Sequence, residues 1–163
     1  MPRSEDALQA QHVLLGGSIE GAVQLFFQAS LAYMDPSTRD EGRGMLQSLM
    51  LPFQSHSIWD RLPGNRLFSS RLGDEQQQLV WRSYVVGATP ENGYRVDVDA
   101  LDIRFERGYL READERGTPV FLLSCRADVP RALYLLPDED SGLWFVNVWD
   151  ELLEDVRPPL TDR

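Results

Sequence analysis

The spacing of apolar residues changes along the chain, and this change predicts the order of its elements. In the first half, apolar residues recur at intervals of three and four, the spacing of one face of a helix. From about residue 79 onward, apolar and polar residues alternate, which is typical of strands with one buried face. We therefore expect helices over about residues 4–62 and a sheet over about residues 79–156.

Capping and stop signals predict two helices at the start of the chain. Ser4 can cap the first helix, and the glycine pair at 16–17 ends it. Ser18 can cap a second helix that runs to about Met34. Asp35 precedes a proline and therefore disfavours helical geometry, which ends the second helix.

A third helix is predicted from Thr38 and Glu41, whose spacing is that of a capping box. Its apolar stripe consists of Met45, Leu46, Leu49 and Met50. Gly42 and Gly44 should weaken its first turns, by about 1 kcal/mol each relative to alanine. Pro52 closes it, and residues 53–78 are expected to be irregular. The apolar anchors of that irregular stretch would be Trp59, Leu62, Leu67 and Phe68.

The second half predicts a series of strands. β-branched and aromatic residues favour a strand over Leu79–Val86, followed by a segment rich in turn formers. Residues 94–98 and 101–105 alternate, and Pro119–Cys125 forms another apolar strand. The last predicted pair, Ala132–Leu136 and Leu143–Trp149, is a hairpin joined by a polar turn at 138–142.

Helices grouped before strands indicate an α+β fold. We expect a single domain over residues 1–163, in which N-terminal helices pack on one face of a C-terminal antiparallel sheet. The closing hairpin, YLLPDEDSGLWFVNVWDE, resembles the last two strands of the nuclear-transport-factor-2-like cone folds. That resemblance implies a curved sheet around a pocket covered by helices.

A second resemblance covers most of the chain. The strings SYVVGATPENGY from residue 83, ADVPR from residue 127 and VRPP from residue 156 are similar to an uncharacterised bacterial domain family. The upstream string LAYMDPSTRDEGRGML resembles the helical part of the same family. What this implies is a small bacterial domain of no established activity, with no catalytic residues to carry over.

Charge and composition narrow the classes of function. The net charge is −10; residues 1–80 hold 6 arginines and 9 acids, and the remainder holds 10 arginines and 17 acids. Without a basic stripe, the chain lacks the main energetic term for binding nucleic acid, and anionic membranes should repel it. The acidity serves solubility or attracts a basic partner. All basic residues are arginines, which indicates a GC-rich, bacterial genome.

The longest apolar run spans five residues, whereas a membrane helix needs about 20. The first residues carry acids where a signal peptide has an apolar stretch. The single cysteine fits a reducing compartment. These three features predict a cytoplasmic protein.

Candidate catalytic groups are few. Cys125 lies at the end of an apolar strand and is interpreted as a small buried hydrophobe. His12 is interpreted as a histidine on a helix surface whose hydrogen bonds are satisfied. His56 is interpreted as part of an irregular segment, next to serines that can cap helices. The acidic clusters at 97–102 and 138–140 do not have the spacing of a calcium loop. We expect no catalytic, cofactor or metal site, and no glycine-rich phosphate loop is present.

The predicted interaction surface lies on two loops, because loops carry function more often than regular elements do. Its residues are Glu91, Asn92, Tyr94, Asp128 and Arg131. A structural interpretation competes with it. In that interpretation Asn92 only shapes a turn, and Asp128 pairs with Arg131 across a strand bend.

Three hypotheses for function follow. The first is a non-enzymatic bacterial protein that binds another protein, which could be basic, in the role of an adaptor, a secretion-associated accessory or an immunity-type protein. The second is a cone-fold binder of small molecules or an enzyme, with Tyr84 or Asp128 beside a histidine in a pocket between helices and sheet. The third is a homodimer whose sheets pack face to face.

Overall fold

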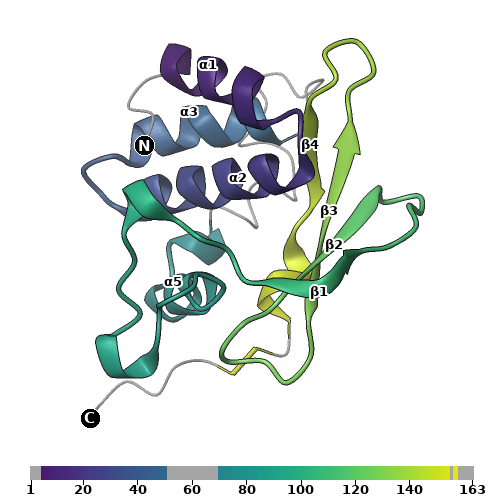
Figure 1. Cartoon of the computed structure of the whole chain (residues 1–163). Coiled ribbons are helices and arrows are strands. Elements are labelled where there is room, and N and C mark those ends of the chain that lie inside the picture. The colour runs from purple at the N-terminus through teal and green to yellow at the C-terminus, as the bar shows by residue number, and fades with distance from the viewer. Residues whose placement is uncertain (1–4, 51–69, 155, 158–163) are drawn as a thin grey trace.

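The first half of the chain folds into helices, as predicted (Figure 1). The computed structural model describes residues 5–50, 70–154, 156 and 157. In these ranges α1 spans Glu5–Leu15, α2 spans Ile19–Met34 and α3 spans Arg39–Leu49. The Ser18 side chain caps α2 by accepting a hydrogen bond from the Gly21 amide at 3.1 Å. Asp35 is extended and ends the helix, which confirms both predicted boundaries of α2.

The start of α3 differs from the prediction. Thr38 makes no capping hydrogen bond, so the expected capping box is wrong. Instead its hydroxyl donates to the Ala32 carbonyl of α2 at 2.8 Å. Gly42 also lies against α2, since a Cβ at this position would be 2.3 Å from the Tyr33 amide nitrogen. The Thr38 hydroxyl and Gly42 therefore allow α2 and α3 to pack close together. Ser4, Pro52 and the predicted anchors between residues 59 and 68 lie outside the described residues.

The strand predicted over Leu79–Val86 is wrong, because this stretch begins inside a helix. α5 spans Glu75–Arg82 and is capped by Asp74, whose carboxylate accepts from the Gln77 amide at 3.0 Å. The glutamate and three glutamines directly before residue 79 are the signal for this helix. Trp81 is fully buried against Phe27 of α2, at 5.2 Å between ring centroids. Packing of these aromatic rings therefore overrides the local preference for a strand.

Extended structure begins about 25 residues later than predicted from Leu79, near Ile103. Val85 contributes a single isolated bridge to Ile103. The alternation over residues 94–98 does not form a strand: one short 3-10 helix, Pro90–Asn92, precedes it, and another, Val98–Ala100, begins at its last residue. The Asp97 carboxylate accepts from the Asp99 amide and turns the chain there.

Four antiparallel strands follow in the order β1-β2-β3-β4, so the predicted α+β class is confirmed. Their bounds are Phe105–Leu110, Thr118–Leu122, Arg131–Pro137 and Trp144–Val148. The predicted hairpin agrees with β3 and β4 within one residue at each end. Its turn holds Gly142 at φ 71°, a conformation that favours glycine. The sheet is open, because β1 and β4 do not pair with each other.

α2 is the central helix of the core. It lies beside α3 and α1 on one side of the sheet, and α5 lies on the side of α2 that is turned away from those two helices (Figure 1). Val23, Leu25, Phe26 and Phe27 of α2 are fully buried, and so are Val120, Leu122, Leu133 and Leu135 of the sheet. Burial of each large apolar side chain contributes about 1.5–3 kcal/mol, which makes this interior the main source of stability. None of the helices in the described ranges is long and apolar enough to cross a membrane.

Candidate functional site

Three segments that are distant in sequence meet at one end of the molecule. We call this surface the loop face and define it as residues 87–94, 124–131, 154 and 156–157. Figure 1 shows the β2–β3 connection and the C-terminal segment at the same end, below α5. The Cys125 thiol donates to the Ala88 carbonyl at 3.8 Å, and Arg126 Nε donates to the Arg157 carbonyl at 3.2 Å. Together with the ion pair between Asp128 and Arg157, these contacts bring the strings GATPENGY, ADVPR and VR of the family resemblance onto one surface.

The first segment of the loop face is shaped by its own polar side chains. Asn92 accepts from the Thr89 amide at 3.0 Å and donates to the Gly87 carbonyl at 2.7 Å. Gly93 and Tyr94 then adopt positive φ angles of 66° and 55°. The Asn92 side chain therefore fixes the loop, in keeping with the structural interpretation of that residue. Glu91 is exposed, and hydrogen bonds from its own amide and from the Thr89 hydroxyl lower the pKa of its carboxyl.

Tyr94 points inward and is only 3% exposed. Burial raises the pKa of its hydroxyl, and the nearby Arg126 guanidinium opposes this shift. Tyr94 therefore connects the first segment of the loop face to the second. It is not available as a direct contact for a partner, although the sequence placed it in the predicted surface.

The expected pair between Asp128 and Arg131 does not form. The Asp128 carboxylate accepts instead from Arg157 Nη2 at 2.7 Å. Arg131 starts β3 and donates to the main-chain carbonyls of Glu154, at 2.7 Å, and Val129, at 3.1 Å. Both arginines bridge to neighbouring segments because the loop before β3 runs beside the C-terminal segment. The Asp128 side chain is 86% exposed, so its ion pair contributes at most about 1 kcal/mol.

Cys125 is exposed, so its interpretation as a buried hydrophobe is wrong. The physical reason is that β2 ends at Leu122, three residues earlier than the predicted strand. Val129 is also exposed, at 57%. Sequence reasoning missed Val129, Arg126 and Arg157 as members of this surface. The signal for Val129 was an apolar side chain inside a polar loop, and that for Arg157 was its place in the VRPP string.

His12 belongs to α1, which Figure 1 shows on the other side of α2 from α5, and its side chain contacts Trp144 and Phe145 of β4. It is buried, so its placement on a helix surface is wrong, but its ring is satisfied as predicted. Nε2 donates to the Trp144 carbonyl at 3.2 Å, and the ring packs edge-on against Phe145 at 4.9 Å. Burial lowers the pKa of His12 below its usual value of 6.5, and the hydrogen bond to Trp144 partly opposes this. His56 lies outside the described residues.

Tyr84 does not face a pocket. Its ring is fully buried beside Phe27, and its hydroxyl donates to the Leu152 carbonyl at 2.5 Å. Burial raises the pKa of this hydroxyl. Of the two residues predicted to stand beside a histidine in a pocket, Tyr84 is therefore enclosed in the core, whereas Asp128 is exposed.

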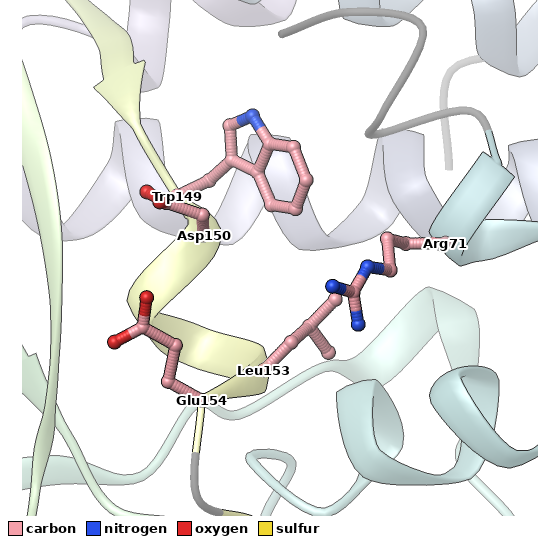
Figure 2. A pocket seen from close by; sticks show the side chains of 5 residues that line it. All are labelled: Arg71, Trp149, Asp150, Leu153 and Glu154. Atoms are coloured by element: carbon pink, nitrogen blue, oxygen red, sulfur yellow. The ribbon is translucent and has the colours of Figure 1, made fainter.

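A hollow of about 310 Å³ lies between Arg71 and the short 3-10 helix Asp150–Leu153 (Figure 2). Its described lining consists of Arg71, Trp149, Asp150, Leu153 and Glu154. In Figure 2 the Arg71 guanidinium approaches Leu153, whereas the carboxylates of Asp150 and Glu154 point away from it. These side chains include no thiol, hydroxyl or imidazole that could serve as a nucleophile. Within the described ranges, no group of three or more histidines, cysteines and acids could hold a metal ion.

Comparison with known proteins identifies a family but no individual relative. No curated protein and no solved structure matches the chain significantly. The model of one protein family, described as "Domain of unknown function (DUF6935)", matches residues 1–160. This agrees with the uncharacterised family indicated by the three strings that meet on the loop face. Because the match covers nearly the whole sequence, the chain belongs to the DUF6935 family.

Proposed function

We propose that this chain is a non-enzymatic protein-binding domain of the bacterial cytoplasm, and that the loop face contacts its partner. Adaptors, secretion-associated accessory proteins and immunity-type proteins all act by binding another protein without catalysis. The observation that carries the proposal is the convergence of three distant segments on one surface, each joined to the next by side-chain hydrogen bonds.

Rigidity of the loop face favours binding. Arg126 and Arg131 donate to main-chain carbonyls of the C-terminal segment, and Asn92 closes the first loop on itself. A surface that is already ordered loses less conformational entropy when a partner binds. Exposed side chains on such a scaffold, among them Asp128 and Val129, are held ready for contact.

The charge of the chain favours a basic partner. The net charge is −10, and the side chains of Glu91 and Asp128 are exposed on the loop face, where they accept hydrogen bonds from Thr89 and Arg157. Two of the arginines nearby, Arg126 and Arg131, direct hydrogen bonds to carbonyls of the chain itself. Opposite charges increase the rate of association and make it sensitive to salt.

The absence of an enzymatic role is part of the proposal. Its support is that Tyr84 is enclosed and bonded to Leu152, and that His12 is bonded to Trp144. The rival proposal, a small-molecule binder or enzyme with a pocket between helices and sheet, is supported by the hollow beside Trp149 (Figure 2). A partner that binds through the loop face needs no such hollow.

A pull-down from a bacterial lysate tests the proposal, with the tagged full chain as bait at about 50 mM and about 500 mM salt, which span strong and weak screening. The test variant is E91Q/D128N, which removes two carboxylates from the loop face. The matched control is E112Q/E115Q, which removes two exposed carboxylates from the β1–β2 connection. We expect a protein partner that is lost at high salt and with the first variant only.

Two outcomes would contradict the proposal. One is that no protein is recovered at low salt. The other is that both double variants reduce capture equally, because the overall charge would then matter and the loop face would not. Light scattering of the purified chain distinguishes a homodimer, whose mass is twice that of the 18.6 kDa chain.

A further inference from the structure

A second hollow, also of about 310 Å³, lies between α2, the end of α5 and the segment that follows Tyr94. Its described lining combines three apolar and three charged side chains: Leu31, Asp35, Arg82, Arg95, Val96 and Val98. The volume is at the lower end of the range for small-ligand sites, about 300–1,000 Å³. This hollow shares no lining residue with the one beside Trp149.

Positive charge exceeds negative charge in this second hollow. Arg82 and Arg95 face a single carboxylate, that of Asp35. One oxygen of Asp35 already accepts two hydrogen bonds from Ser37, from its amide and its hydroxyl, both at 2.8 Å. Hydrogen bonds from Ser37, with a smaller contribution from nearby arginines, lower the pKa of Asp35, so this group is ionised at neutral pH. A net positive charge remains in the hollow of a chain whose overall charge is −10.

The Arg82 guanidinium is only partly satisfied by the described part of the chain. The Nε of Arg82 is buried and has no hydrogen-bond partner among the residues that the structure describes. Burial lowers the pKa of Arg82, and Asp35 only partly opposes this effect. Because the Arg82 side chain lines the hollow, its guanidinium could donate to an anion bound there. Planar carboxylates match guanidinium donors in geometry.

The other half of the lining is aliphatic. Leu31 belongs to the buried face of α2, and Val96 and Val98 are partly buried against the core. An ion alone would not use this surface, whereas an aliphatic chain would transfer apolar area from water onto it. The lining therefore suits a ligand with an anionic end and an apolar body.

We propose that this hollow binds an aliphatic carboxylate, with Arg82 and Arg95 donating to the carboxylate and Leu31, Val96 and Val98 contacting the aliphatic group. The ligand is either a free short-chain acid or the C-terminal carboxylate of a protein that ends in an aliphatic residue. The chemistry of recognition is the same for both sources. This inference does not rest on the loop-face proposal, because it uses other side chains.

An NMR titration of the full chain tests the inference, with the amide signals of Val96 and Val98 as reporters. The probes are 4-methylpentanoate and its neutral amide, and the peptide acetyl-Ala-Ala-Leu with a free or an amidated C-terminus. We expect saturable shifts with a Kd of about 1 mM for the acids and at least about tenfold weaker binding of the amides. Tighter binding of the peptide acid than of the free acid assigns a protein C-terminus; equal binding assigns a small acid.

The variant R95Q provides the test of position, because Arg95 is exposed and its substitution leaves the core intact. R95Q should weaken the binding of the acids by at least about fivefold. R107Q, which changes an exposed arginine on β1, should leave their binding unchanged. The inference is overturned if acids and amides bind equally, if R95Q binds like the wild type, or if no shift saturates below about 20 mM. Displacement of the acids by equimolar inorganic phosphate would also overturn it, since the aliphatic lining would then contribute nothing.

Discussion

The interior between helices and sheet and the loop face are held together by different kinds of contact. In the interior, Phe26, Phe27 and Trp81 are fully buried and contact one another through their rings. On the loop face, polar side chains bond to main-chain carbonyls while Asp128 and Val129 remain exposed. The difference predicts that the stability of the chain and the proposed recognition by the loop face can be changed separately. Changes in the interior should unfold the chain, and changes on the loop face should leave it folded.

The largest loss of stability is expected from W81A. Trp81 lies 5.6 Å from Phe26 and 5.2 Å from Phe27 between ring centroids, so its removal leaves a cavity in the centre of the core. The expected loss is about 3–5 kcal/mol in the free energy of unfolding, measured by urea denaturation. A loss below about 1 kcal/mol would mean that the aromatic cluster is not a main source of stability.

The two glycines of α3 should respond in opposite directions to alanine. In G42A the new Cβ would lie 2.3 Å from the Tyr33 amide nitrogen, which is backbone and cannot rotate away. We expect a loss of about 1–3 kcal/mol, as for other overpacked sites. In G44A the new methyl group meets nothing within 4 Å, so the variant should gain up to about 1 kcal/mol from helix propensity. Equal effects in thermal unfolding would show that α2 and α3 do not approach closely here.

A smaller effect is expected from Y84F. The variant keeps the ring beside Phe27 but removes the hydroxyl that donates to the Leu152 carbonyl. The carbonyl loses this donor, which should lower the free energy of unfolding by about 1–2 kcal/mol in urea denaturation. A variant as stable as the wild type would indicate that water reaches Leu152.

The smallest effect concerns pH. Because burial lowers the pKa of His12, the unfolded chain binds a proton at this residue more readily than the folded chain. Stability from neutral His12 is therefore present above pH 6.5 and is lost as pH falls from 6.5 through the lowered pKa of the folded state. The difference in Tm between pH 7.5 and about 5 should shrink in H12Q, which retains a donor for Trp144. An unchanged difference would contradict the burial of His12.

The parts of the fold that sequence predicted well depend on local signals. The hairpin of β3 and β4 followed from alternation on both sides of a turn built around Asp138 and Gly142. α5 was missed because Val80 and Trp81 favour strands by themselves, and the burial of Trp81 against α2 depends on contacts with residues about 50 positions away.

The candidate site shows the same limit. The Asn-Gly pair at 92–93 correctly predicted a turn with positive φ angles in this loop. The partner of Asp128 was predicted to be Arg131, three residues away, but it is Arg157, which is 29 residues away. Charge pairs between distant segments depend on which segments the fold brings together, and no local pattern records that. For the same reason Tyr94 was expected at the surface, although it is enclosed next to Arg126.

The most direct test of a separable recognition surface compares two exposed valines, Val129 on the loop face and Val13 on α1, which are 57% and 70% exposed. Partner capture is measured for V129D and V13D alongside the free energy of unfolding. Our account predicts at least about tenfold weaker capture for V129D alone, with both variants within about 0.5 kcal/mol of wild-type stability. Loss of capture in V13D but not in V129D would contradict it and would place the recognition surface on α1.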